Sequence, residues 1–277
     1  MKTTSVQEIK DTLVDVGIGQ GDSVFIHSSL FTLGKIQNVT PQDIPLTFLS
    51  CFTDVIGEQG NVFMPCFNYD FPRTRQADLN VQKTVLGYWP EWFRNRKDVV
   101  RSGHPMFSVC GIGPDAKTIC QPEQPEFFAF GDNSTFSRLV ESDCVLILQG
   151  IGLRVATVVV QIEAMLGLKY RFNKPFMGEV TLTDGQVIRD NFYHFCFPLN
   201  NAYRENYSPL EKALLEQGVM KKSALGRSFI YAVRMADLFN AVQDITLNDK
   251  FALLNCRPHE LYRFEDGKEV PYSANKY

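Results

Sequence analysis

A short polar cluster follows the first strongly apolar run of the sequence. The cluster consists of His27, Ser28 and Ser29, and the run before it is entered through Gly21 and Asp22. Its side chains and backbone can donate hydrogen bonds to a ligand. If the run is a strand of an α/β sheet, the cluster stands at its carboxyl end, where such sheets place ligand-binding loops. Capping of a following turn by the two serines is the alternative.

A second cluster combines a cation, two hydroxyls and an imidazole within eight residues. It consists of Arg101, Ser102, His104 and Ser108. Pro105 disfavours the helical conformation for His104, and an imidazole is a common general base near neutral pH. We therefore take His104 as a candidate base, beside the alternative that it is a hydrogen-bonded structural histidine.

The elements that must position these clusters follow the order of an α/β sheet. Apolar spacing predicts a helix over 5–16, and the Val-Phe-Ile run predicts a strand over 23–27. Thr40 and Pro41 predict the start of a second helix that ends at Gly57. A strand over 61–64 completes a βαβ unit with parallel pairing.

The remaining chain predicts further elements of the same domain. A buried strand over 144–148 leads into a glycine turn and a helix from 157, and Asp184-Gly185 predicts an antiparallel hairpin. Further helices are expected from 208 and over 236–242. The expected fold is therefore α/β, with three α/β/α layers, a mixed, largely parallel central sheet and an antiparallel C-terminal portion, in one domain spanning 1–277.

A long irregular segment over 68–89 is expected to contact substrate, because compact domains keep such loops mainly for function. Asn68 and Tyr69 are its candidate substrate-binding residues. Glu91, shortly after it, is a further candidate. Glu91 could equally pair with Arg94, three residues along the same helix, and contribute little to stability.

Composition excludes several classes of function. The 28 basic and 31 acidic residues leave a net charge of −3, which disfavours nucleic acid as a partner. Neither a membrane span nor a signal peptide is indicated, so a cytoplasmic protein is expected. Seven cysteines without a C-x-x-C pair, and only four histidines, predict neither disulfides nor a metal site.

Three blocks of sequence resemble the aminoglycoside N3-acetyltransferase-like family and span most of the first 170 residues. The first reads G-D-x-(apolar)-x-H-S-S-L and ends at Leu30. The second combines G-x-x-x-E-x-F-R from Gly87 with R-S-x-H-P-x-x-S from Arg101. The third runs from Gly131 through a strand and a helix to Glu163.

The resemblance implies an enzyme that transfers an acetyl or short acyl group from acyl-coenzyme A to an amine of an amino sugar. It implies acetyl-CoA as co-substrate and no metal. Acyl transfer needs a base, oxyanion donors and anchors for a phosphorylated cofactor. The residues that the resemblance assigns to cofactor binding are His27, Ser28, Ser29, Leu30, Arg101, Ser102 and Ser108.

The third block departs from the family pattern T-x-x-H-x-x-E, because Val160 stands where that pattern has a histidine implicated in catalysis. Gln161 beside it cannot accept a proton at physiological pH. Three explanations compete. His104 or Glu163 could act as the base, the acceptor amine could be weakly basic, or the chain could be a catalytically impaired cofactor- or nucleotide-binding protein of the same fold.

A basic and aromatic stretch follows that helix. Arg171 and Lys174 could bind the diphosphate of a nucleotide-linked amino sugar. A solvated loop with surface ion pairs is the alternative. The resemblance weakens after about residue 178, so 175–277 is expected to form the acceptor side, and a homo-oligomer is compatible with the sequence.

Overall fold

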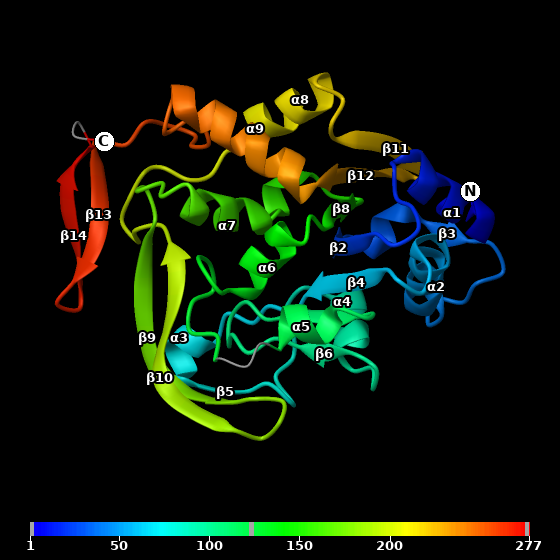
Figure 1. Ribbon diagram of the computed structural model, residues 1–277, viewed down its shortest axis with the longest axis horizontal. Coiled ribbons are helices and arrows are strands. Elements are labelled where there is room, and N and C mark those ends of the chain that lie inside the picture. The colour runs from blue at the N-terminus through cyan, green and yellow to red at the C-terminus, as the bar shows by residue number, and fades with distance from the viewer. Residues whose placement is uncertain (1–2, 122–124, 275–276) are drawn as a thin grey trace.

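The computed structural model describes residues 3–121, 125–274 and 277, and it is built around a seven-stranded sheet (Figure 1). The strand order is β11-β12-β8-β2-β4-β7-β6. The strands are β2 (Ser23–Ser28), β4 (Asn61–Pro65), β6 (Val100–Arg101), β7 (Val109–Ile112), β8 (Val145–Gln149), β11 (Lys221–Leu225) and β12 (Ser228–Arg234).

This sheet is mixed, as predicted, but it is not largely parallel. β2 pairs in parallel with β4 and β8, which confirms the expected βαβ unit. The other four pairings described in this sheet, β12 with β8, β11 with β12, β4 with β7 and β6 with β7, are antiparallel. Their sequence signals are weak, because β6 has only two residues and because β4 pairs with β7, and β8 with β12, across long stretches of sequence.

A long hairpin, β9 (Phe172–Thr181) with β10 (Val187–Cys196), follows the parallel core. Its turn is the predicted Asp184-Gly185, where Gly185 has a φ of 86°. The strand β5 (Gln76–Asp78) pairs in parallel with β9. The segment 68–89 is thus not wholly irregular, since it also contains α3 (Phe71–Thr74). Two shorter pairs complete the strands: β1 (Thr3–Thr4) with β3 (Lys35–Ile36), and β13 (Glu260–Glu265) with β14 (Lys268–Ser273).

Helices pack on both faces of the central sheet. Val24 and Ile26 share one apolar core with helices α1, α2 and α4, whereas Phe25 between them faces a second core formed with α5 to α9. This alternation is that of a strand buried on both faces. The helices are α1 (Val6–Asp15), α2 (Ile44–Ile56), α4 (Tyr88–Arg94), α5 (Ala116–Cys120), α6 (Thr135–Glu141), α7 (Val158–Met165), α8 (Ser208–Glu216) and α9 (Met235–Asn248), with 3₁₀ turns η1 (Leu30–Leu33) and η2 (Leu153–Val155).

The start of α1 agrees with the sequence prediction, whereas the start of α2 does not. Ser5 forms the predicted capping box with Glu8 at the start of α1. The predicted start of α2 was wrong: it begins at Ile44, because Thr40 bonds to the Asp43 side chain at 2.6 Å and closes a separate turn. No helix in the described ranges combines the length and apolar character needed to cross a bilayer.

Candidate active site

Two loops meet at the carboxyl ends of β2 and β8. The amide of Ser29 donates to the carbonyl of Gln149 at 2.8 Å. Gly150 has a φ of 70°, and a Cβ there would lie 2.1 Å from the Thr32 hydroxyl, so only glycine fits. Helix α2 after β2 and helix α6 before β8 cover opposite faces of the sheet. Open α/β sheets bind ligands at the point where the helices connected to two neighbouring strands lie on opposite faces of the sheet.

Buried polar atoms without protein partners gather at this edge. The Nε2 of His27, the Oγ of Ser28 and both amide atoms of Gln149 have no hydrogen-bond partner among the described residues. Ser28 and Gln149 are neighbours in the register of the two parallel strands. Burial lowers the pKa of His27 to about 4, so its imidazole is neutral at pH 7. These atoms are free to bond with a polar ligand or with water.

The rim of this edge is aromatic. Phe31, just after the serines, and Tyr88, at the start of α4, are 60% and 46% exposed, and their rings stack at 6.2 Å. Leu30, predicted to touch the cofactor, is instead buried in the core beside α2. The 3₁₀ turn that begins at Leu30 points this side chain into that core, and its contact with the cofactor stays a prediction.

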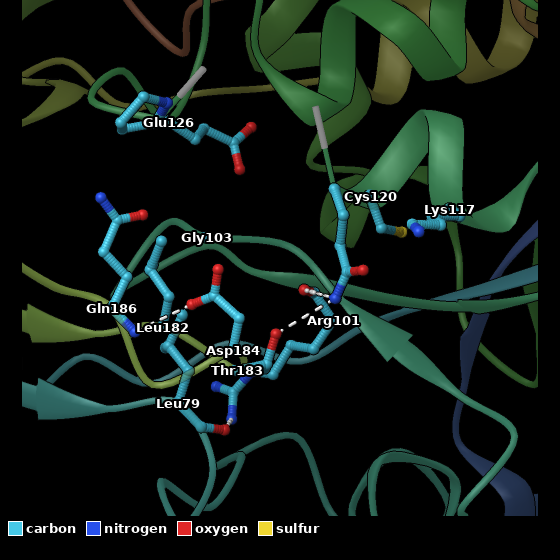
Figure 2. Close-up of a pocket in the computed structure, with 12 residues that line it drawn as sticks. Leu79, Arg101, Gly103, Lys117, Cys120, Glu126, Leu182, Thr183, Asp184 and Gln186 are labelled. Carbon is cyan, nitrogen blue, oxygen red and sulfur yellow. Dashed lines mark hydrogen bonds between the residues drawn. The ribbon is translucent and has the colours of Figure 1, made fainter. Parts of the chain in front are cut away.

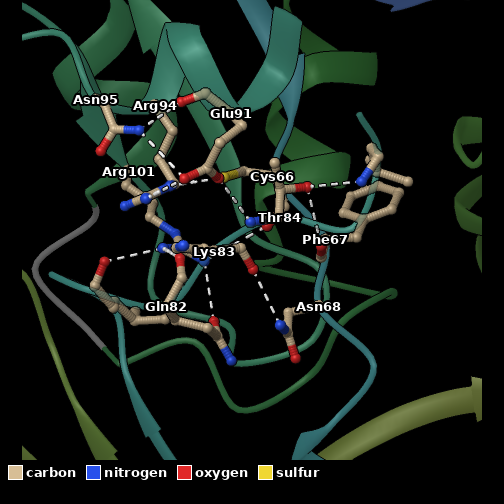
Figure 3. Close-up of polar contacts among 12 residues, drawn as sticks. Cys66, Phe67, Asn68, Gln82, Lys83, Thr84, Glu91, Arg94, Asn95 and Arg101 are labelled. Carbon is tan, nitrogen blue, oxygen red and sulfur yellow. Dashed lines mark hydrogen bonds and ion pairs between the residues drawn. The ribbon is translucent and has the colours of Figure 1, made fainter. Parts of the chain in front are cut away.

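Arg101 and Ser108 both donate to the carbonyl of Cys66, the residue after β4, and Figure 3 shows Arg101 among these polar contacts. All five N–H donors of the Arg101 guanidinium are used, by the Ser108 hydroxyl, by the side chain of Gln82 and by backbone carbonyls including that of Cys66. Ser102 is fully buried and accepts from an amide of β7. These three residues therefore bond within the protein, and their contact with the cofactor stays a prediction.

Asn68 and Glu91 also bond within the protein (Figure 3). The Asn68 amide donates to the carbonyl of Lys83 at 2.9 Å. Glu91 pairs with Arg94 at 2.6 Å, the alternative considered from their spacing, and accepts from the Thr84 amide. Burial opposes ionisation of Glu91, but these bonds outweigh it and lower its pKa to about 2. The side chains of Asn68 and Glu91 thus already bond to other groups of the protein.

Tyr69 differs from these two, because its side chain is 53% exposed. Its ring packs against Phe67 and Phe107 at the carboxyl end of β4. Tyr69 is therefore the candidate in this segment that a substrate can reach.

His104 is a poor candidate for a base in this structure. Its side chain is fully buried, and its Nδ1 accepts from the amides of Met106 and Phe107 at 3.3 and 3.2 Å. The Nε2 faces the carbonyl of Tyr193 without a hydrogen bond of good geometry. Burial, with a smaller effect of His194, lowers the pKa of His104 to about 3. The ring thus holds the turn before β7, which is the structural alternative.

Glu163 is buried, and its carboxylate already forms an ion pair. Its carboxylate pairs with Arg171 at 2.7 Å and accepts from the Tyr207 hydroxyl at 3.2 Å. The Arg171 guanidinium also lies 3.7 Å from the ring centroid of Phe197. The second cation of this stretch, Lys174, pairs with Glu269 at 2.8 Å. Neither cation is free for the diphosphate predicted from the sequence, and Glu163 is not open to an amine.

Val160 lies on helix α7 and is only partly buried. Ala164, one turn further along the same face of α7, lines a surface pocket. Gln161, fully buried, accepts from the Gly131 amide at 2.8 Å. Gln161 therefore fixes the loop that precedes α6 and borders the same pocket.

His194 is a feature that sequence reasoning missed, having considered it only as a metal ligand. It is half-buried on β10, with its ring 4.7 Å from Phe107 and 6.4 Å from Phe130. Burial, and then the charge of Arg171, lower its pKa to about 3. The neutral imidazole can donate or accept a hydrogen bond. The alternation of strand 187–196 was the available signal, but only the hairpin's docking brings His194 against Phe107 and Phe130.

The pocket beside α7 has a volume of about 1100 Å³. Its walls include three carboxylates, Glu126, Asp132 and Glu141, and one cation, Arg138. Aromatic rings, including Phe130, form the rest of the lining, together with residues of β9 and β10. The pocket therefore combines negative charge with apolar rings. Within the described ranges, no group of three or more His, Cys, Asp or Glu is placed to hold a metal ion.

Comparison with known proteins identifies the family. The family model of aminoglycoside 3-N-acetyltransferases matches residues 25–246. The chain belongs to this family. The match includes the edge of β2 and β8 and the whole of α7. It confirms the family expected from the sequence and, with it, the enzyme class of coenzyme A-dependent N-acetyltransferases.

Individual relatives agree with this family. Aminoglycoside N(3)-acetyltransferase IX of Micromonospora chalcea is 24% identical over 260 residues, which cover 84% of this chain and 89% of the relative. Aminoglycoside N(3)-acetyltransferase VII of Streptomyces paromomycinus is 30% identical over 172 residues, 55% of this chain and 58% of that one.

Solved structures share the fold. AAC-IIIb, determined as a binary complex with CoASH, superposes with a TM-score of 0.75 at 18% identity, covering 92% of this chain and 100% of that one. YokD from Bacillus subtilis gives 0.71 at 18% identity, covering 90% and 95%. The complex of AAC-IIIb agrees with coenzyme A as the expected co-substrate of the family.

Proposed function

We propose that this chain transfers an acetyl or short acyl group from acyl-coenzyme A to an amine of an amino sugar. In this reaction the amine nitrogen attacks the thioester carbonyl, the C–N bond forms and the C–S bond breaks. The amine loses one proton and the leaving sulfur gains one. The observation that carries the proposal is the pair of loops at the carboxyl ends of β2 and β8, which lies within the family match.

That edge fits the cofactor. Coenzyme A carries amides and phosphates, which need polar partners, and the unpartnered atoms of His27 and Ser28 are such partners. Ser29 beside them is half-buried. The exposed, stacked rings of Phe31 and Tyr88 offer an apolar platform next to these polar atoms. We therefore retain His27, Ser28 and Ser29 as cofactor-binding residues and leave out the buried Leu30.

The acceptor is best matched by a cationic amino sugar. The pocket beside α7 has three carboxylates against one guanidinium, so it attracts ammonium groups. Its aromatic walls can pack on the apolar faces of sugar rings and add cation–π attraction. Phe195 belongs to this lining, which is consistent with 175–277 as the acceptor side. A nucleotide-linked acceptor is disfavoured, since Arg171 and Lys174 are paired.

The burial of His104 and the ion pair of Glu163 leave both predicted bases unsuited to take a proton from an amine. We therefore propose that the amine reaches the thioester already neutral, which makes the reaction slower for strongly basic amines. A histidine introduced at Val160 would stand on the pocket side of α7. It is expected to raise kcat by about 10²–10⁴, the usual contribution of a general base.

The test is release of free thiol from acetyl-CoA, measured with aminoglycosides and nucleotide-linked amino sugars as acceptors. Thiol release with the cationic aminoglycosides is expected. Coenzyme A binding without turnover by any amine would instead establish the catalytically impaired alternative. Val160→His is compared with Val14→His, which adds a histidine on an exposed face of α1. Equal kcat values for the two variants would contradict the proposed absence of a base.

A further inference from the structure

A second, smaller pocket lies under the tip of the β9–β10 hairpin (Figure 2). Its volume is about 370 Å³, at the lower end of the range for small-molecule sites. Gln121, just after α5, donates to the Thr183 hydroxyl at 3.1 Å and ties the hairpin tip to α5. Leu182 and Gly103 face each other within it, because a Cβ on Gly103 would lie 3.5 Å from the Leu182 side chain. The pocket is thus formed by segments far apart in the sequence.

Glu126 forms the wall between this pocket and the larger one beside α7. Only 5% of the residue is exposed. One carboxylate oxygen, Oε1, accepts a hydrogen bond from the Thr135 amide and lies 3.8 Å from the Arg138 guanidinium. The Ser102 hydroxyl is nearby without hydrogen-bond geometry, and Oε2 has no partner among the described residues. A buried carboxylate oxygen in this state is costly unless something binds it.

The Glu126 carboxylate lies at the wall of this pocket. Figure 2 shows the carboxylates of Glu126 and Asp184 pointing from opposite walls toward the same space. Of the two cations in the lining, Arg101 has all its donors occupied, whereas Lys117 is exposed. Burial raises the pKa of Glu126, and a bound cation would offset that cost. Among the described lining residues, the charged groups left for a ligand are therefore the Glu126 and Asp184 carboxylates and the Lys117 ammonium. One Asp184 oxygen, Oδ1, also accepts from the Gln186 amide at 2.9 Å.

We propose that this small pocket is a subsite for a non-reacting ammonium group of the amino-sugar acceptor, held by Glu126 and Asp184. The ring hydroxyls of such a sugar supply acceptors for Lys117, which a simple alkylamine lacks. The choice of an amino sugar as the ligand rests on the proposed function. The presence of an ammonium site rests only on the buried Oε2 and on the shape of the pocket.

The experiment measures binding of glucosamine by calorimetry in the absence of acetyl-CoA. N-acetylglucosamine is the neutral comparison, because it keeps the ring and removes the ammonium. Glu126→Gln keeps an oxygen for the Thr135 amide and removes the charge. Gly103→Val fills the pocket without changing any charge, and its backbone is not in the left-handed region. Glu216→Gln removes the same charge from an exposed position on α8.

Glucosamine is expected to bind the unaltered protein at least tenfold more tightly than N-acetylglucosamine. Glu126→Gln and Gly103→Val should each weaken glucosamine binding about tenfold to hundredfold, the usual effect of losing a hydrogen bond to a charged group. Glu216→Gln should leave it unchanged. Absence of glucosamine binding, equal binding of the two sugars, or unaltered binding by Glu126→Gln with its thermal unfolding preserved would overturn the inference.

This design separates the subsite from the proposed function. Glucosamine binding that depends on Glu126, without any thiol release, would keep the ammonium site and reject the transferase. Thiol release with aminoglycosides, together with unchanged binding by Glu126→Gln, would keep the transferase and reject the subsite.

Discussion

Replacing Arg171 by methionine should destabilise the protein far more than the loss of an ordinary ion pair. The Glu163 side chain is 0% exposed and that of Arg171 8% exposed, and their atoms Oε2 and Nε are 2.7 Å apart. Without Arg171, the carboxylate keeps only the Tyr207 hydroxyl, at 3.2 Å. Removing one partner of a buried pair leaves an uncompensated charge, which costs about 3–5 kcal/mol.

The assay is urea unfolding at neutral pH, with a matched surface pair as control. Lys212 and Glu216 are 75% and 67% exposed and 3.7 Å apart on α8. Lys212→Met should therefore lower the free energy of unfolding by only about 0.3–0.5 kcal/mol. An Arg171→Met variant that loses no more than Lys212→Met would refute the argument that burial makes this pair critical.

The double variant Glu163→Gln/Arg171→Met tests the same reasoning in reverse. Removal of both charges leaves neither uncompensated, so most of the stability lost in Arg171→Met should return. The single variant Glu163→Gln separates the roles considered for Glu163. An anchoring role predicts that Glu163→Gln loses stability and turnover together, whereas a general base predicts lower kcat at unchanged stability.

Two further predictions concern stability alone. The pKa values of His27 and His104, about 4 and about 3, lie below the value of about 6.5 in an unfolded chain, so the unfolded state binds more protons as the pH falls. These two groups alone should thus lower the free energy of unfolding by about 2.7 kcal/mol per pH unit as the pH falls from about 6.5 to about 4, and His194, whose pKa is lowered to about 3, should steepen the decline. Urea unfolding measures this slope, and a flat profile would contradict the prediction. Gly226→Ala should cost more than about 1 kcal/mol, since its φ is 60° and a Cβ would lie 2.1 Å from the carbonyl of Leu33. Gly218→Ala, with a φ of 70° and open space, should show the conformational strain alone in the same thermal unfolding assay.

The proposed function and the inferred subsite place demands on different parts of the molecule. In the proposed function, cofactor binding depends on the edge of β2 and β8, which the family match includes. Acceptor binding depends on the loop before α6 and on the β9–β10 hairpin, which line both pockets. Variation in the hairpin can therefore change the acceptor while the cofactor edge is preserved.

The sequence by itself determined the features that depend on residues close together in the chain. The capping box of Ser5, the turn at Asp184-Gly185 and the Glu91–Arg94 pair each involve residues within three or four positions. The βαβ unit was also readable, since a single helical crossover between two successive apolar runs favours parallel strands. The family followed from several such local blocks read in order.

Only the tertiary structure decided which of the candidate residues can reach a ligand. His104 and Glu163 have suitable chemistry in sequence, but packing buries one and pairs the other with Arg171. The antiparallel strands beside β4 and β8 depend on contacts between distant segments, which carry no local signal. Glu126 became notable for the same reason, because its unpartnered oxygen and its pocket result from the hairpin docking against α5 and the loop before α6. Burial and partnership are properties of the folded chain, and they separate the residues that can act from those that only support the fold.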